Sequence, residues 1–202
     1  ESGSMFYFTN TKANVELSNT TLDFDSDAAA LITAAGNDSN NWGSAGSNGA
    51  TVVFTGRNQT LKGTVSADTI SSVTLNLLDG STWTGTASIT DNASAVSRST
   101  SAQPISVNVD GSSTWTVTGN TTVSALNVAE GGKVVDANGN TATIVANGKT
   151  VAKGTGSVTV TVTGDYGTSV DGDADGTTLT DDLIDRSDYD STFDTSSSWS
   201  MS

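Results

Sequence analysis

The 202-residue sequence contains no cysteine and no histidine. The absence of cysteine excludes disulfides and thiolate-bound metals, and the absence of histidine removes the commonest catalytic base and zinc ligand. Only eight basic residues stand against 22 acidic residues, which gives a formal net charge of −14. Because the basic residues are few and scattered, we expect no binding to nucleic acid or to anionic membrane surfaces.

Long apolar runs and helix-forming residues are also scarce. No apolar segment approaches the roughly 20 residues that a membrane-spanning helix needs, so we expect no membrane insertion. Thr, Ser, Gly, Asp and Asn account for 119 residues, whereas Glu, Lys, Gln, Leu, Met and Arg together reach only 25. This composition excludes a helical bundle and predicts an all-β fold.

Short β-branched runs, each closed by a Gly, Asp or Asn turn, recur along the chain. They predict strands within residues 50–56, 73–80, 105–111, 121–132 and 158–164. The best internal match sets residues 75–83 beside residues 107–115, and residues 126–134 form a third copy 19 residues later. A period near 20 residues, with no helix between the strands, is typical of a solenoid of stacked coils.

We therefore predict a parallel β-helix of roughly eight rungs over residues 1–164, followed by an acidic C-terminal cap or tail over residues 165–202. Irregular loops are expected to leave the rod at residues 37–49 and 89–103.

The repeat alignment also predicts which side chains stack on one another. Asn76, Asn108 and Asn127 share one position, and stacked asparagines can form a hydrogen-bonded ladder along the axis. Trp83 and Trp115 share another position with Val134. Because valine replaces a buried ring more readily than an exposed one, we expect a core column there rather than a sugar-binding platform.

The loop at residues 37–49 contains the best candidate for an exposed aromatic side chain. Trp42 follows Asn40 and Asn41 in a Gly/Ser/Asn-rich stretch. An exposed ring beside amide groups suits the apolar face and the hydroxyls of a sugar, and loops commonly carry binding specificity. We predict a binding site at Trp42, Asn40 and Asn41.

The acidic C-terminal region contains one candidate metal site. Asp171, Asp173, Asp175 and Asp182 occupy positions 1, 3, 5 and 12 of a loop with Gly176 at position 6, and resemble the calcium loop of a dockerin. Thr178 departs from the apolar residue expected at position 8. Calcium is the only cofactor that the sequence suggests, and a solvated acidic loop is the alternative.

Carboxylates are the only abundant groups that could support catalysis. Asp23, Asp25 and Asp27 alternate along a predicted strand, and Asp181 and Asp182 form a second pair. Parallel β-helix glycoside hydrolases carry an Asp-Asp element together with a Gly-His-Gly element, and this chain has only the Asp-Asp. Threonine triplets at 82–86, 114–118 and 159–163 place hydroxyls on strand faces, but they are too irregularly spaced to favour ice binding.

Several features together resemble bacterial extracellular right-handed parallel β-helix adhesins. They are the Val/Leu-Asn-Val/Leu strands with their Gly turns, the Ser-Thr-Trp-Thr continuation, and residues 123–128 followed by Gly131-Gly132. The resemblance implies a non-enzymatic module, secreted or on the cell surface, that displays loops to host or environmental glycans or proteins. A polysaccharide-active enzyme and a self-assembling surface component, associating end to end through an uncapped rung, remain the alternatives.

Overall fold

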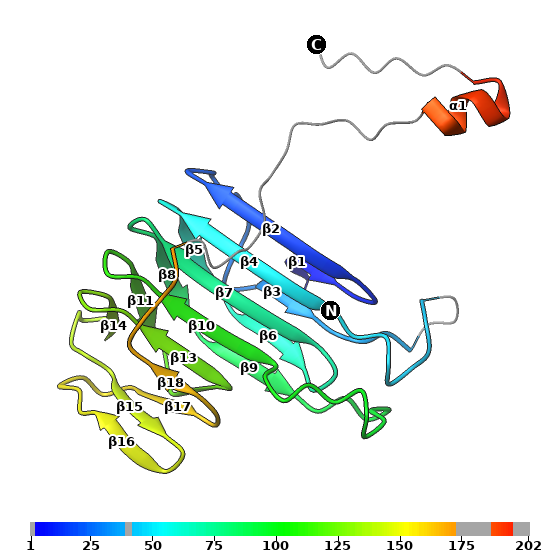
Figure 1. The fold of residues 1–202 in the computed structure, drawn as a ribbon. Helices are drawn as coiled ribbons and strands as arrows, with labels where there is room; N and C mark the ends of the chain where they lie inside the picture. The colour runs from blue at the N-terminus through cyan, green and yellow to red at the C-terminus, as the bar shows by residue number, and fades with distance from the viewer. Residues whose placement is uncertain (1–2, 39–41, 173–186, 196–202) are drawn as a thin grey trace.

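The computed structural model describes residues 3–38, 42–172 and 187–195, and in these it is all-β apart from one seven-residue helix, α1 (Ser187–Phe193). The strands form four sheets (Figure 1). Sheet A contains, in spatial order, β1 (Ser4–Phe8), β3 (Ala30–Ala34), β6 (Val65–Asp68) and β9 (Ala87–Thr90). Sheet B likewise runs through β18 (Tyr166–Gly167), β13 (Ala125–Val128), β10 (Ile105–Val109), β7 (Ser72–Leu78), β4 (Thr51–Arg57) and β2 (Lys12–Ser18). Sheet C runs through β14 (Lys133–Asp136), β11 (Thr114–Val117), β8 (Thr82–Gly85) and β5 (Thr60–Lys62). Sheet D runs through β12 (Thr121–Val123), β17 (Thr159–Val162), β15 (Thr143–Ala146) and β16 (Lys149–Ala152).

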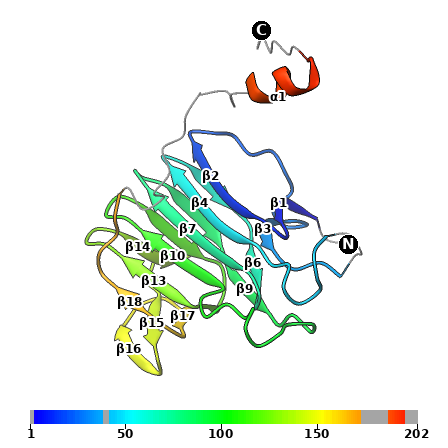
Figure 2. The ribbon, with the colours of Figure 1, turned by 45° about the vertical axis from the view of Figure 1, so that its right-hand side comes forward.

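The chain passes through the sheets in a repeating order. β3, β4 and β5 enter sheets A, B and C in turn, and β6–β8 and β9–β11 repeat this order one position further along each sheet. Every pairing between these strands is parallel, and the hairpin β15–β16 is the antiparallel exception among the paired strands. Figures 1 and 2 show the strands of successive passes lying side by side, from β1 and β2 at one end to the hairpin at the other.

The alternation of side chains along each strand explains where the core lies. In β10, Ile105, Val107 and Val109 are fully buried, whereas the residues between them are only partly covered. Successive side chains of a strand point to opposite faces, so the apolar set of each strand faces the interior enclosed by the sheets. The core is therefore one continuous cluster that runs from β3 to β17.

The predicted asparagine ladder is confirmed on sheet B. Asn76, Asn108 and Asn127 are in register on β7, β10 and β13. The Nδ2 of Asn127 donates to the Oδ1 of Asn108 at 2.8 Å, and the Nδ2 of Asn108 donates to the Oδ1 of Asn76 at 2.7 Å. Asn76 continues the chain by donating to the hydroxyl of Thr55 at 3.0 Å. Because an amide side chain can both donate and accept, each hydrogen bond of the ladder joins two neighbouring strands.

The predicted tryptophan column is also confirmed as part of the core. The rings of Trp83 and Trp115 are fully buried and stacked, with centroids 4.6 Å apart and an interplanar angle of 12°. Leu61 lies in register on one side of the pair and Val134 on the other. Each indole N–H donates to a backbone carbonyl, that of Trp83 at 2.9 Å and that of Trp115 at 3.1 Å, so no polar atom of the stack is left unsatisfied.

Other expectations differ from the structure. The largest sheet has six strands in the described residues rather than about eight rungs. The β15–β16 hairpin and residues 19–29, 35–38, 42–50 and 91–104 leave the regular stack. Residues 89 and 90 belong to β9, so the second insertion begins at residue 91. The segment carrying Asp23, Asp25 and Asp27 is not a strand: its alternate residues are exposed, but the backbone N–H of Thr20 at its start bonds the side chain of Gln59 instead of a neighbouring strand.

The ladder makes a graded prediction for stability. Replacement of Asn108 by alanine (N108A) removes two ladder bonds and leaves the buried Oδ1 of Asn76 without its donor, whereas N127A removes one bond at the end of the ladder. We expect N108A to lower the free energy of unfolding by about 1–3 kcal/mol, and N127A by less. Denaturant unfolding curves measure both, and equal losses would contradict a cooperative ladder.

The tryptophan column gives a second prediction. W115A leaves a large cavity under Trp83, so the free energy of unfolding should fall by about 3–5 kcal/mol. The control T116A changes the neighbouring residue, which is only partly buried. It should alter the free energy of unfolding by less than about 0.5 kcal/mol. The same unfolding measurement separates the two, and a small effect of W115A would show that the column is not a central part of the core.

Candidate functional site

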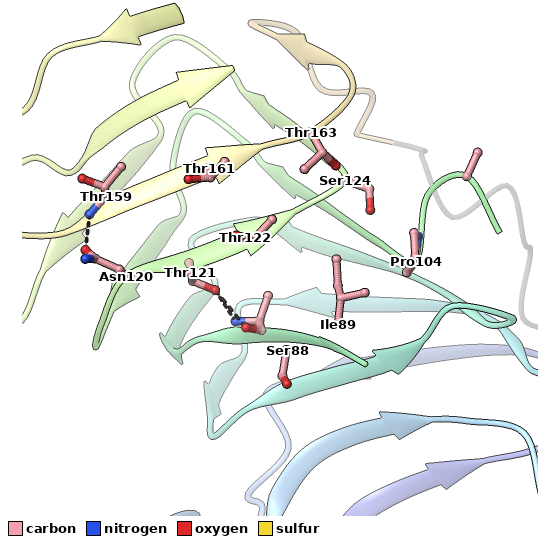
Figure 3. Close-up of a pocket in the computed structure, with 12 residues that line it drawn as sticks. Ser88, Ile89, Pro104, Asn120, Thr121, Thr122, Ser124, Thr159, Thr161 and Thr163 are labelled. Carbon is pink, nitrogen blue, oxygen red and sulfur yellow. Dashed lines mark hydrogen bonds between the residues drawn. The ribbon is translucent and has the colours of Figure 1, made fainter. Parts of the chain in front are cut away.

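One hollow on the surface is an open groove of about 740 Å³ at the junction of sheets A and D (Figure 3). Its lining consists of uncharged residues rich in hydroxyls: Ala87, Ser88, Ile89, Ala102, Pro104, Asn120, Thr121, Thr122, Ser124, Thr159, Thr161 and Thr163. β9, β12 and β17 supply the floor, and Ala102 and Pro104 come from the end of the second insertion.

The groove forms where the backbone ladder between successive strands is interrupted. β9 ends sheet A and β12 begins sheet D, and a side chain joins them. The Oγ1 of Thr121 accepts a hydrogen bond from the backbone N–H of Ala87 at 2.9 Å and donates to the carbonyl of the same residue at 2.9 Å. The threonine hydroxyl thereby satisfies backbone groups that a strand partner would otherwise pair, and Figure 3 shows the first of these bonds at the floor of the groove.

Hydroxyl side chains line up across the strands on this face. Thr33, Ser66 and Ser88 are in register on β3, β6 and β9, and Thr122 is in register with Thr161 on the other side of the junction. Strand neighbours lie about 4.8 Å apart, so the hydroxyls form a row with one group at each step. Thr122 is exposed, and the others are partly exposed.

A second groove of about 640 Å³ continues the first along sheet A. The two grooves share Ser88, and the second is lined by the row residues Thr33 and Ser66 together with Tyr7 of β1 and the segment 26–30. Asp27 is the single charged residue in its lining. The two grooves therefore make one polar track along the sheet A and sheet D face.

The two insertions expected from the sequence pack against each other. The hydroxyl of Ser99 and the backbone N–H of Val96, both in the second insertion, donate to the carbonyl of Gly46 in the first. Gly46 has a φ of 78°, and a Cβ there would lie 1.7 Å from the carbonyl oxygen of Ser94, so the contact requires glycine. The loops therefore form one surface, which we call the loop platform (residues 35–38, 42–50 and 91–104).

Two buried polar side chains hold the bases of the loop platform. Asn48 is 1% exposed, and its amide donates to the carbonyls of Asn37 and of Trp42, the latter at 2.9 Å. Asp68 is 5% exposed and accepts hydrogen bonds from the backbone N–H of Gly36 at 2.7 Å and from the Nδ2 of Asn92 at 2.8 Å. A single carboxylate thus ties the start of one insertion to the start of the other.

The predicted binding residues lie in the loop platform as far as the structure describes them. The Trp42 side chain is 56% exposed, as expected for an aromatic that could contact a ligand. Asn40 and Asn41 lie outside the described residues. Val96 in the other insertion is also an exposed apolar side chain, at 45%.

The predicted calcium loop falls mainly outside the described residues. Asp171 is exposed, whereas Asp173, Asp175 and Asp182 lie in the undescribed part of the chain, as does the Asp181-Asp182 pair. Within the described ranges, no three acidic side chains come close enough together to hold a metal ion.

Two carboxylates in the described part of the chain have shifted pKa values, and turn geometry explains both. Burial acts to raise the pKa of Asp110, but hydrogen bonds from the N–H of Asp79 and from the N–H and hydroxyl of Ser112 outweigh it, so the pKa lies below its ordinary value. Burial also opposes the lowered pKa of Asp136, which accepts from the N–H groups of Asn140, Asn138 and Ser157. A carboxyl group that acts as a general acid needs a raised pKa, so these two carboxylates do not resemble catalytic acids. Their hydrogen bonds stabilise turns.

Sequence reasoning identifies the loops but misses the groove. Thr159, Thr161 and Thr163 are visible in the sequence as a hydroxyl triplet, yet Ser88 and Thr122 join them only because the insertion changes which strands are neighbours. The available signal is the alternation of Ser and Thr with apolar residues in each of these short strands.

Comparisons with known proteins do not assign the chain to a family: no family model, no curated protein and no solved structure matches it. The described part of the chain also has no helix that is long and apolar enough to span a membrane.

The lowered pKa of Asp136 gives a pH prediction. A carboxylate whose pKa is depressed by folding contributes stability above its ordinary pKa of 3.8, and this contribution is lost as the pH falls through the lower folded value. We expect D136N to lower the melting temperature at pH 7 and to lose most of that difference near pH 3. Thermal unfolding at both pH values tests this, and an equal deficit at both would refute it.

Proposed function

We propose that the chain is a non-enzymatic, adhesin-like parallel β-helix module that binds a neutral glycan along the polar track of sheets A and D. The observation that carries this proposal is the open, uncharged groove at the sheet junction, with hydroxyls repeating at each strand.

The strand order supports the β-helix part of the proposal. Each pass of the chain contributes strands to sheets A, B and C in the same sequence, and equivalent residues of successive passes are in register. In a parallel β-helix, stacked coils produce this pattern. The sheets remain separate units because short turns and the side-chain bridge at Thr121 interrupt the strands between them.

The chemistry of the groove favours a carbohydrate over other ligands. Serine and threonine hydroxyls and the amide of Asn120 can donate to and accept from sugar hydroxyls. No charged side chain in the larger groove would attract an anionic or cationic ligand. Because the track follows the strand-stacking direction, it suits an extended chain of sugar units rather than a single small molecule.

A polysaccharide-cleaving enzyme is the less favoured interpretation. Glycoside hydrolysis needs two carboxyl groups about 5–9.5 Å apart across the bond that breaks. The larger groove has no carboxylate in its lining, and the second groove contributes Asp27 alone. These observations support binding rather than cleavage.

The cellular setting of the proposal comes from the sequence. The resemblance to bacterial surface adhesins and the Ser/Thr/Asn-rich, cysteine-free composition favour a secreted or surface-displayed module. A glycan or protein of a host or of the environment would then be its partner, and the exposed Trp42 on the loop platform is the second candidate contact.

The proposal predicts that a large charged side chain in the groove prevents binding. T122R should weaken binding to a neutral polysaccharide by about tenfold or more, because the side chain would occupy the floor of the groove. The matched control T82R makes the same change at an exposed position on sheet C and should have no effect. Binding can be measured on a glycan array and then by calorimetry, with and without calcium.

The outcomes separate the two candidate sites. Loss with T122R but not with T82R or W42A supports the groove. Loss with W42A alone places binding on the loop platform and contradicts the groove. Absence of binding to every neutral glycan, with the protein folded, would overturn the proposed function.

A further inference from the structure

Tyr7 of β1 is the aromatic side chain in the lining of the polar track. It is 52% exposed and points outward, because the alternate residues of β1 pack on the core. Its strand neighbour is Thr33 of β3, and Ser66 and Ser88 follow in register on β6 and β9. The second groove therefore combines one exposed ring with hydroxyls on the following strands.

Asp27 lines the same groove from the segment between β2 and β3. A turn holds it there: the N–H of Asp27 donates to the Oδ1 of Asp25 at 3.0 Å, and the N–H groups of Ala28 and Ala29 donate to the carbonyl of Asp25 at 3.2 and 2.9 Å. Lys62 lines a neighbouring hollow together with Asp27, but the described residues form no ion pair between the two. The carboxylate of Asp27 can therefore accept hydrogen bonds from a ligand.

An aromatic ring, a carboxylate and hydroxyls in one groove match the chemistry of a particular kind of sugar. A hexose whose hydroxyls all lie at the edge of its ring presents C–H groups on its faces, and such a face can pack on the ring of Tyr7. A carboxylate can accept hydrogen bonds from two neighbouring hydroxyls, and bonds to an ionised acceptor are the stronger ones. The hydroxyl of Ser4 donates to the Oγ1 of Thr33 at 2.7 Å, so the hydroxyl hydrogen of Thr33 is free to donate to the same ligand.

We infer that the second groove is a sugar subsite selective for β-linked glucan chains, with one glucose ring on Tyr7 and two of its hydroxyls on Asp27. This inference rests on the proposed function and names the class of glycan that the track selects. An axial hydroxyl would hold the ring away from Tyr7, and the carboxylate of a uronic acid would be repelled by Asp27. A β-linked glucan is also extended, as a ligand that follows the track must be, whereas an α-linked glucan coils.

Calorimetric titration of the full chain with cellohexaose, a β-linked glucose oligomer, tests the stacking contact. Y7A should weaken binding by about fivefold or more because it removes the ring, whereas Y7F keeps the ring and should change the dissociation constant by less than about twofold. The control M5A removes an exposed apolar side chain of the same strand outside the track lining and should leave binding unchanged. The melting temperature of each variant confirms that it is folded.

Two further ligands test the selectivity. Maltohexaose, an α-linked glucose oligomer, should bind about tenfold or more weakly than cellohexaose. A β-linked glucuronic acid oligomer should bind D27N at least about fivefold more tightly than it binds the unchanged chain, because D27N removes the repelling charge. The control D23N makes the same charge change at an exposed position of the same segment, outside the track lining, and should give no such gain.

The outcomes distinguish this inference from the proposed function. If T122R weakens the binding of a neutral glycan but Y7A binds it as well as M5A does, the function stands and the inference is overturned. Equal affinities for maltohexaose and cellohexaose, or equal gains for D27N and D23N, would also overturn the inference alone. Absence of binding to every neutral glycan would overturn the proposed function and the inference with it.

Discussion

In-register stacking of parallel strands is the constraint on which the rest of this structure depends. Each pass of the chain places a strand next to the equivalent strand of the previous pass. Equivalent residues therefore become neighbours, and the side chain at each position must pack against the same kind of side chain in the adjacent strand. Trp83 and Trp115 meet this condition because flat rings stack at 4.6 Å, close to the strand spacing. Asn76, Asn108 and Asn127 meet it because an amide can donate in one direction and accept in the other.

This constraint also explains how a sequence so poor in large apolar residues folds. Each pass adds a few valine, leucine and isoleucine side chains to one continuous core, and most polar residues lie on outward positions and in turns. Turns stack as strands do: the N–H of Asp79 donates to the carboxylate of Asp110, and the N–H of Gly80 donates to the hydroxyl of Ser112 in the next pass. Aspartate and serine therefore stabilise the stack where a less repetitive protein would need more buried area.

The same reasoning decides what could be predicted from the sequence. The strand register was predictable because an asparagine recurs at Asn76, Asn108 and Asn127 and a tryptophan recurs at Trp83 and Trp115. Residues that repeat at the same position of the repeat lie side by side in the sheet. The grooves were not predictable, since Thr122 and Ser88 become neighbours only through the bridge formed by Thr121, a single side-chain contact between strands separated by an insertion. The strand predicted at Asp23 and Asp25 was wrong for a related reason. Their segment alternates as a strand does, but the backbone of Thr20 at its start bonds the side chain of Gln59 instead of a neighbouring strand.

Distinct surface features arise where the repetition is broken. A regular stack offers uniform walls, and the polar groove of sheets A and D exists because the backbone ladder between β9 and β12 is replaced by a hydroxyl. The loop platform exists because two passes leave the stack at adjacent positions and are tied together by the buried carboxylate of Asp68.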